Sequence, residues 1–290
     1  MHYQGLFKLT LSLIVATLTC AQTGIAQSPT TQPGNSNPVT LPPLTAKEQA
    51  IINAANRAPA DVAAPRIDIT PYNKDGTRNS NFGRPQQWFL AQHEQFLKRR
   101  EHPVGLLFLG DSITAGWATN GKNVWNDRFA RYDAANFGIN GSRTDYVLWQ
   151  IDHGELDGIK PKVIVLMIGT NNYGSSAGQV VSGIKAILNR IHAKLPETKV
   201  LLLGIFPRGP VAADSNNVPD PGRKKLMAIN AGLAKFDDGS RVRYLEIWRQ
   251  FLKEDGSLPS EIMPDALHPS EKGYVIWADT MQPLLTEMQK

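Results

Sequence analysis

The stretch VGLLFLGDSIT, residues 104–114, joins an almost wholly apolar run to a turn that opens with a glycine. A short apolar run of this kind is typical of a strand that is buried on both faces of a sheet. Ser112 follows the run directly, and ligand sites of parallel sheets lie beyond the carboxyl ends of the strands. The stretch therefore predicts a buried parallel strand that presents a serine hydroxyl at its carboxyl end.

Four further apolar runs of similar length follow along the chain. They are Ala134–Phe137, Val163–Ile168, Val200–Ile205 and Val242–Ile247. Helical patterns alternate with the runs, at Trp88–Arg99, Tyr146–His153, Ala177–Lys194, Arg223–Lys235 and Glu271–Met288. This alternation predicts an α/β domain in which helices cover both faces of a five-stranded parallel sheet. Right-handed crossovers bring the carboxyl ends of all the strands to one edge, where we expect the functional residues.

Three of the strands end in polar or glycine-rich segments. The first is Gly110–Thr114, and the second is Asn136–Arg143. The second can expose unpaired backbone N–H groups to an anion, because Gly138 and Gly141 carry no Cβ. The third is Gly169–Asn172, where a side-chain amide could donate a hydrogen bond into the same space. Taken one at a time, each segment can also be a simple turn, and a Gly-Asp-Ser segment is more often just that.

A carboxylate and an imidazole stand three residues apart in Asp265–His268, just before the last helical pattern. Asp265 can reach the Nδ1–H of His268, fix the tautomer and leave Nε2 free as a base, although the pair could also be a simple helix cap. No two histidines stand at metal-ligand spacing, so we expect no metal. A serine, two donor segments and this pair at one sheet edge together indicate a catalytic site rather than four unrelated turns.

In combination, these four segments resemble the SGNH, or GDSL-type, hydrolase family, and they occur in that family's order. Residues 135–208 are most similar to the catalytic subunits of the intracellular platelet-activating-factor acetylhydrolases, with VLWQ at 147–150 and LGIFPRG at 203–209 among the shared stretches. The resemblance covers the chain from about Val104 to its end. It implies a flavodoxin-like fold, a single three-layer α/β/α domain, which we place at residues 86–290.

The resemblance also implies the roles of the site residues. Ser112 corresponds to the nucleophile, His268 to its base and Asp265 to the group that orients the base. The oxyanion donors correspond to the backbone N–H groups of Ser112 and Gly141 and to the side chain of Asn171. No cofactor is implied.

Two departures from the acetylhydrolase pattern bear on the substrate. Asn140 stands where those subunits have glycine; since asparagine tolerates positive φ, we expect the turn to survive. The segment 211–222 looks longer than its counterpart. Four aromatic residues lie near the strand ends and either stack on sugar rings or simply pack in the interior: Trp117, Trp125, Tyr146 and Tyr173. Trp117 and Tyr173 are the candidates for substrate binding.

The pattern predicts a serine esterase that acts through an acyl-enzyme on short acyl esters, with acetyl esters first. Acetylated carbohydrate is the leading substrate, and lysophospholipid or another lipid ester is the alternative. Transferase or peptidase chemistry is open to the same triad. An alternative of another class is a glycan-binding module without catalysis. Oligomeric state does not follow from the sequence.

The N-terminus predicts export. Lys8, the apolar run Leu9–Leu18 and the small residues up to Ala26 form a secretory signal peptide, residues 1–26, whose apolar run is too short to span a membrane. The expected location is periplasmic or extracellular. Lipidation at Cys20, the single cysteine, is an alternative fate of this segment.

Composition limits the remaining possibilities. With 41% hydrophobic and 20% charged residues the chain is globular, and one cysteine excludes a disulfide-stapled fold. The net charge of +5 is dispersed, so no nucleic-acid partner is expected. Residues 27–45 are rich in Ser, Thr, Pro, Gln and Asn and read as a disordered tether. Residues 46–85 form an N-terminal extension, in which Thr45 is expected to cap a short helix with Glu48.

Overall fold

The computed structural model describes residues 43–57, 66–209 and 221–290. The predicted signal peptide, Cys20 and nearly all of the predicted tether lie outside these ranges, as does most of the segment 211–222. Within the described ranges, no helix combines the length and the apolarity needed to cross a bilayer.

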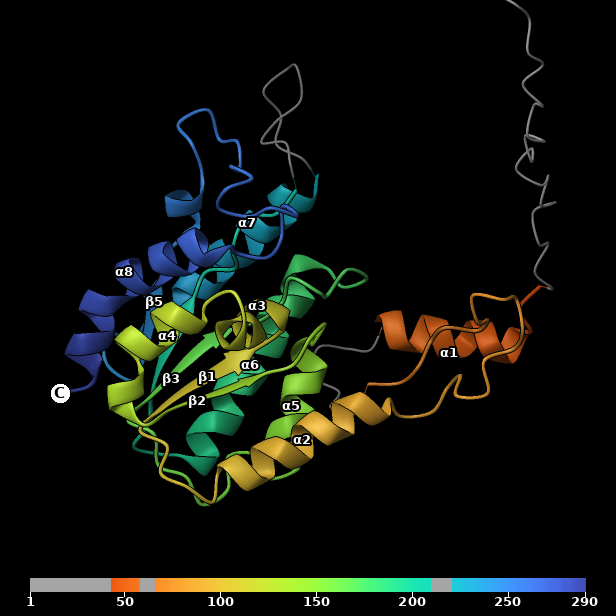
Figure 1. Cartoon of the computed structure of the whole chain (residues 1–290), viewed down its shortest axis with the longest axis horizontal. Helices are drawn as coiled ribbons and strands as arrows, with labels where there is room; N and C mark the ends of the chain where they lie inside the picture. The colour runs from red at the N-terminus through yellow and green to blue at the C-terminus, as the bar shows by residue number, and fades with distance from the viewer. Residues whose placement is uncertain (1–42, 58–65, 210–220) are drawn as a thin grey trace, which may run out of the picture. The chain divides into compact units, whose positions relative to one another are not determined.

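Five parallel strands form one sheet in the order β2-β1-β3-β4-β5 (Figure 1). Their bounds are β1 Leu106–Gly110, β2 Ala134–Gly138, β3 Val163–Met167, β4 Lys199–Leu203 and β5 Val242–Leu245. The predicted five-stranded parallel sheet is therefore confirmed. Gly110 at the end of β1 pairs with Gly138 of β2 and with Met167 of β3, so three strand ends lie level with one another.

The helices agree closely with the sequence patterns. Their bounds are α1 Ala46–Arg57, α2 Gln87–Arg99, α3 Ser112–Ala115, α4 Lys122–Arg128, α5 Thr144–Asp152, α6 Ala177–Lys194, α7 Pro221–Leu233 and α8 Glu271–Met288. The sequence did not predict α3 and α4, because a helix of one or two turns carries too little periodicity. At α1, the Thr45 hydroxyl accepts the Glu48 N–H at 3.2 Å, and Glu48 accepts the Thr45 N–H at 2.8 Å, which is the expected capping box.

Two separate apolar cores cover the two faces of the sheet, so the domain has three layers. Alternate strand residues such as Leu107 and Ile164 pack in one core with α2, α5, α6 and α7. Their neighbours, such as Phe108 and Val165, pack in the other with α3, α4 and α8. Figure 1 shows the sheet between these groups of helices. This is the three-layer α/β/α domain that the sequence predicts.

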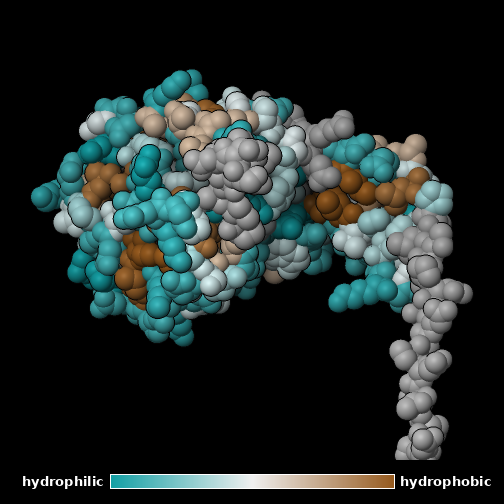
Figure 2. Space-filling model, turned by 90° about the horizontal axis from the view of Figure 1, so that it is seen from above, coloured by the Kyte–Doolittle hydropathy of each residue, from teal (hydrophilic) through white to brown (hydrophobic). Residues whose placement is uncertain are grey.

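Large aromatic residues fill the core on the α8 side. Trp117 is 1% exposed, and the centre of its ring lies 4.5 Å from that of Tyr274 and 4.9 Å from that of Trp277. On the face seen in Figure 2, hydrophobic residues form separate patches among hydrophilic ones. The sheet and its two cores thus hold the level strand ends in place.

Candidate active site

A hydrogen-bonded chain of three side chains lies at the carboxyl edge of the sheet. Ser112 Oγ is 2.8 Å from His268 Nε2, although the two residues are 156 positions apart in the chain. His268 Nδ1 is 2.6 Å from Asp265 Oδ2. Because an ionised carboxylate can only accept, Nδ1 carries the ring proton and Nε2 is the acceptor for the serine hydroxyl. The structure therefore brings together the serine, the imidazole and the carboxylate singled out in the sequence.

Ser112 is held by the tight connection from β1 to α3. Asp111 is the N-cap of α3, and its Oδ1 accepts the Ile113 N–H at 3.0 Å. The Tyr274 hydroxyl of α8 donates to the Ile113 carbonyl at 2.7 Å and ties α3 to the last helix. Ser112 is thus the first residue of α3, and within the described residues its N–H has no acceptor.

The loop that carries His268 is held by the carboxylate of Asp265 at three points. Asp265 Oδ1 accepts the backbone N–H groups of Leu267 at 3.0 Å and of His268 at 2.7 Å, while Oδ2 takes the ring Nδ1–H. Partial burial opposes ionisation, but these hydrogen bonds outweigh it and hold the pKa of Asp265 below its ordinary value. Ala266 adopts φ 56°, which is uncommon for a residue with a Cβ and makes the loop tight enough for these bonds.

The loop after β2, the strand next to β1, forms a turn at the same edge of the sheet. The Ser142 N–H donates to the Ile139 carbonyl at 3.1 Å, and Gly141 has φ +67°. Among the described residues, the Gly141 N–H has no acceptor. Asn171, from the loop after β3, donates from Nδ2 to the Ser142 carbonyl at 3.0 Å. One of the two amide hydrogens of Asn171 remains available. The loops after β2 and β3 therefore offer one donor each, from Gly141 and from Asn171.

The turn accommodates Asn140 for a different reason from the one expected. Positive φ falls on Gly141, while Asn140 is not among the described residues with positive φ. Asparagine at position 140 therefore needs no left-handed conformation.

Of the four aromatic candidates, Tyr173 alone is well exposed. It is 66% exposed and accepts a hydrogen bond on its hydroxyl from Arg208 at 2.9 Å. Trp117, the other predicted substrate-binding residue, is buried in the core on the α8 side. Tyr146 is also buried, and Trp125 is half-buried. The position of an aromatic residue near a strand end does not tell whether its ring faces solvent or the core.

A cavity of about 370 Å³ lies beside Asn171 and is lined by Arg143, Asn171, Tyr173 and Gly174. Arg143 was not among the predicted site residues. It pairs with the buried Asp145 at 2.7 Å and lies over the ring of Tyr146. Its position directly after the Asn140-Gly141-Ser142 turn is the sequence feature that could have indicated a place near the site. The cavity next to the predicted donor Asn171 thus has an arginine and a tyrosine in its wall.

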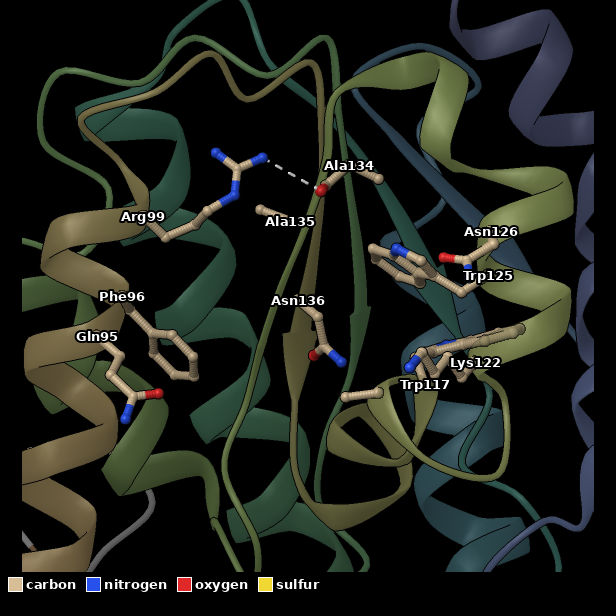
Figure 3. A pocket seen from close by; sticks show the side chains of 11 residues that line it. Gln95, Phe96, Arg99, Trp117, Lys122, Trp125, Asn126, Ala134, Ala135 and Asn136 are labelled. Carbon is tan, nitrogen blue, oxygen red and sulfur yellow. Dashed lines mark hydrogen bonds between the residues drawn. The ribbon is translucent and has the colours of Figure 1, made fainter.

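A second cavity, of about 460 Å³, lies along the edge strand β2 between α2 and α4 (Figure 3). Its wall includes Phe96, Trp125 and Asn136, and Arg99 donates to the Ala134 carbonyl at 3.3 Å. None of Ser112, Asp265 and His268 lines either cavity. We place the candidate active site at the strand ends, because these three residues are hydrogen-bonded to one another there. Within the part of the chain that the structure describes, no group of three His, Cys, Asp or Glu residues could hold a metal ion.

Known proteins with a similar sequence or fold identify the family of this protein. Residues 108–276 match the GDSL-like lipase/acylhydrolase family. A GDSL-like lipase from Bacteroides thetaiotaomicron shares the fold with a TM-score of 0.54 at 18% identity, over 68% of this chain and 98% of that one. A member of the lipolytic G-D-S-L family from Veillonella parvula does so with a TM-score of 0.50 at 18% identity, over 62% and 97%.

Two curated relatives are more similar in sequence. The alpha1 subunit of platelet-activating factor acetylhydrolase IB from Homo sapiens is 32% identical over 203 residues, 70% of this chain and 84% of that protein. The alpha2 subunit from Mus musculus is 34% identical over 202 residues, 69% and 84%. The chain belongs to the GDSL-like lipase/acylhydrolase family. It is a carboxylic ester hydrolase, similar to these acetylhydrolases.

The second carboxylate of the site behaves oppositely to Asp265. Asp111 is 1% exposed, and burial raises its pKa to about 7, although the Ile113 N–H and the nearby His268 act against this rise. The folded protein therefore keeps the Asp111 proton at pH values where the unfolded chain, with an ordinary Asp pKa of about 4, has released it. By linkage, the contribution of Asp111 to the free energy of unfolding falls as pH rises from about 4 to about 7.

The variant Asp111→Asn keeps an acceptor for the Ile113 N–H and has no proton to lose, so we expect it to lack this fall in stability. Urea unfolding across that pH range measures the difference between variant and wild type. Asp127→Asn, whose side chain is 75% exposed, serves as the control and should follow the wild type. An Asp111→Asn protein with the wild-type pH dependence would contradict the assignment.

Proposed function

We propose that the protein is an exported serine esterase that removes short acyl groups, acetyl above all, from carbohydrate through an acyl-enzyme. The observation that carries this proposal is the hydrogen-bonded chain from Asp265 through His268 to Ser112. In it, the nucleophile, its base and the group that orients the base stand in the geometry that acyl transfer needs.

The reaction follows from that geometry in two half-reactions. His268 Nε2 takes the Ser112 proton as Oγ attacks the ester carbonyl carbon, and the carbonyl oxygen becomes an oxyanion. The N–H groups of Ser112 and Gly141 and the amide of Asn171 stabilise that charge. His268 then gives the proton to the departing alcohol, leaving an acyl-Ser112. Water, deprotonated by the same imidazole, attacks this ester, and the acid leaves as Ser112 regains its proton.

The surroundings of Asn171 support a small acyl group and a polar alcohol. Among the described residues, the cavity there is lined by two polar side chains, a tyrosine and a glycine, none of which is aliphatic. The side chains of Asp265 and His268 are 56% and 38% exposed, so a bulky polymer can approach them. Tyr173 presents an exposed ring of the kind that stacks on sugars. The two relatives are acetylhydrolases, which supports acetyl as the acyl group.

Export rests on the sequence of residues 1–26. We expect the enzyme in the periplasm or outside the cell, with a new N-terminus near residue 27. N-terminal sequencing of protein recovered from cell fractions measures this. A chain that still begins at Met1, or one that begins with a lipidated Cys20, would contradict it.

Ser112→Ala should abolish turnover of p-nitrophenyl acetate and of acetylated xylan while the protein keeps its melting temperature, because no other group can form the acyl-enzyme. Deacetylation of xylan and of acetylated chitooligosaccharides should exceed hydrolysis of lysophospholipid. The opposite ranking would favour the lipid-ester alternative. A wild-type protein that binds glycan without turnover would instead be a binding module.

Asn171→Ala should lower kcat by roughly 10²–10³-fold with little change in KM, the usual loss when one oxyanion donor is removed. Steady-state kinetics with p-nitrophenyl acetate measure the loss. Thr170→Ser, in the neighbouring position, serves as a control and should stay near wild type. Nearly unaltered turnover in Asn171→Ala would exclude this side chain as a donor.

A further inference from the structure

Residues 66–86 fold back on themselves just before α2, and we call this segment the 66–86 hairpin. Ile67 and Pro85 form an antiparallel bridge. At the open end, the Gln86 N–H donates to the Arg66 carbonyl at 2.8 Å, and one residue later α2 begins. The backbone of Arg66 is therefore anchored to the start of a helix that packs on the sheet.

The guanidinium of Arg66 lies on the turn after β2. Its Nη1 donates to the Asn140 carbonyl at 2.5 Å, a contact between residues 74 positions apart. The same guanidinium lies over the ring of Trp88, 4.9 Å from its centre. A Cβ at position 141 would collide with the guanidinium, so the close approach requires glycine there. Arg66 is thus held between α2 and the turn that carries Gly141.

The bonded carbonyl belongs to the central peptide of the turn Ile139–Ser142. With φ +67° at Gly141, this turn resembles type II, in which the third residue has φ near +80°. In type I the third residue has φ near −90°, and the central peptide faces the opposite way. The direction of the Gly141 N–H therefore depends on which of the two states this one peptide adopts.

A single contact can select that state, because C=O and N–H of a planar trans peptide point in opposite directions. When the Asn140 carbonyl faces Arg66, the Gly141 N–H faces away from Arg66. That N–H has no acceptor among the described residues. The bond from a cation also polarises the peptide and strengthens its N–H as a donor.

We propose that Arg66 is a positioning residue for the esterase reaction: it locks the Asn140–Gly141 peptide in the orientation that presents the Gly141 N–H to the oxyanion. The inference rests on the proposed function, since it needs Ser112 and Gly141 in the roles assigned to them. It gives the 66–86 hairpin a part in catalysis, although the family match begins only at residue 108.

The decisive variants are Arg66→Met, which keeps an unbranched stem without donors, and Arg66→Lys, which keeps a cationic donor. With p-nitrophenyl acetate, Arg66→Met should lower kcat by about 10–100-fold, less than or equal to the loss of a whole donor, with KM nearly unchanged. Arg66→Lys should recover much of that loss. In Arg66→Ala, millimolar guanidinium ion should restore part of kcat. Arg84→Ala, an exposed arginine of the same hairpin, is the matched control and should behave as wild type.

Thermal melting and Ser112→Ala distinguish the ways in which the inference can fail. Wild-type kcat in Arg66→Met, with Ser112→Ala inactive, would overturn the role of Arg66 and leave the proposed function standing. Both variants, Arg66→Met and Arg66→Lys, could instead lose kcat together with a lowered melting temperature, and guanidinium ion could fail to rescue Arg66→Ala. Arg66 would then be a structural anchor, and its role as a positioning residue would also be overturned. Turnover that survives Ser112→Ala would overturn the proposed function itself.

Discussion

The level pairing of three strand ends is the constraint on which the site depends. Gly110 aligns with Gly138 on one side and with Met167 on the other, so the loops that follow start from the same height. A Cβ at Gly138 would meet the backbone of Asp111 and Ala115, which shows how closely α3 lies against β2. The loops after β1, β2 and β3 therefore begin at one edge of the sheet.

Two aspartates of the site have pKa values shifted in opposite directions by their surroundings. Asp111 is buried with a single backbone donor, and burial raises its pKa. Asp265 receives three hydrogen bonds at an exposed position, and its pKa is lowered. The first is a neutralisable cap that shapes the turn around Ser112. The second stays ionised and can hold the His268 ring in one tautomer.

Ser112 and His268 belong to opposite ends of the domain, and the last helix joins them. Ser270 caps α8 just after His268, while Tyr274 in the first turns of α8 bonds to Ile113 beside the serine. Packing of α8 on the sheet therefore fixes the distance between imidazole and hydroxyl. A different part of the edge holds the cavity beside Asn171, and Tyr173 and Arg143 lie in its wall.

The sequence by itself determined the sheet, its long helices and the identity of the candidate triad. Buried strands, amphipathic helices and the Asp265–His268 spacing are local patterns, and local patterns record which elements form. The tertiary structure alone decided that Trp117 is buried while Tyr173 is exposed, that Asn171 bonds to the Ser142 carbonyl, and that Arg66 reaches Asn140. Each of these is a contact between distant segments, set by how the layers pack, and no periodicity along the chain encodes that packing.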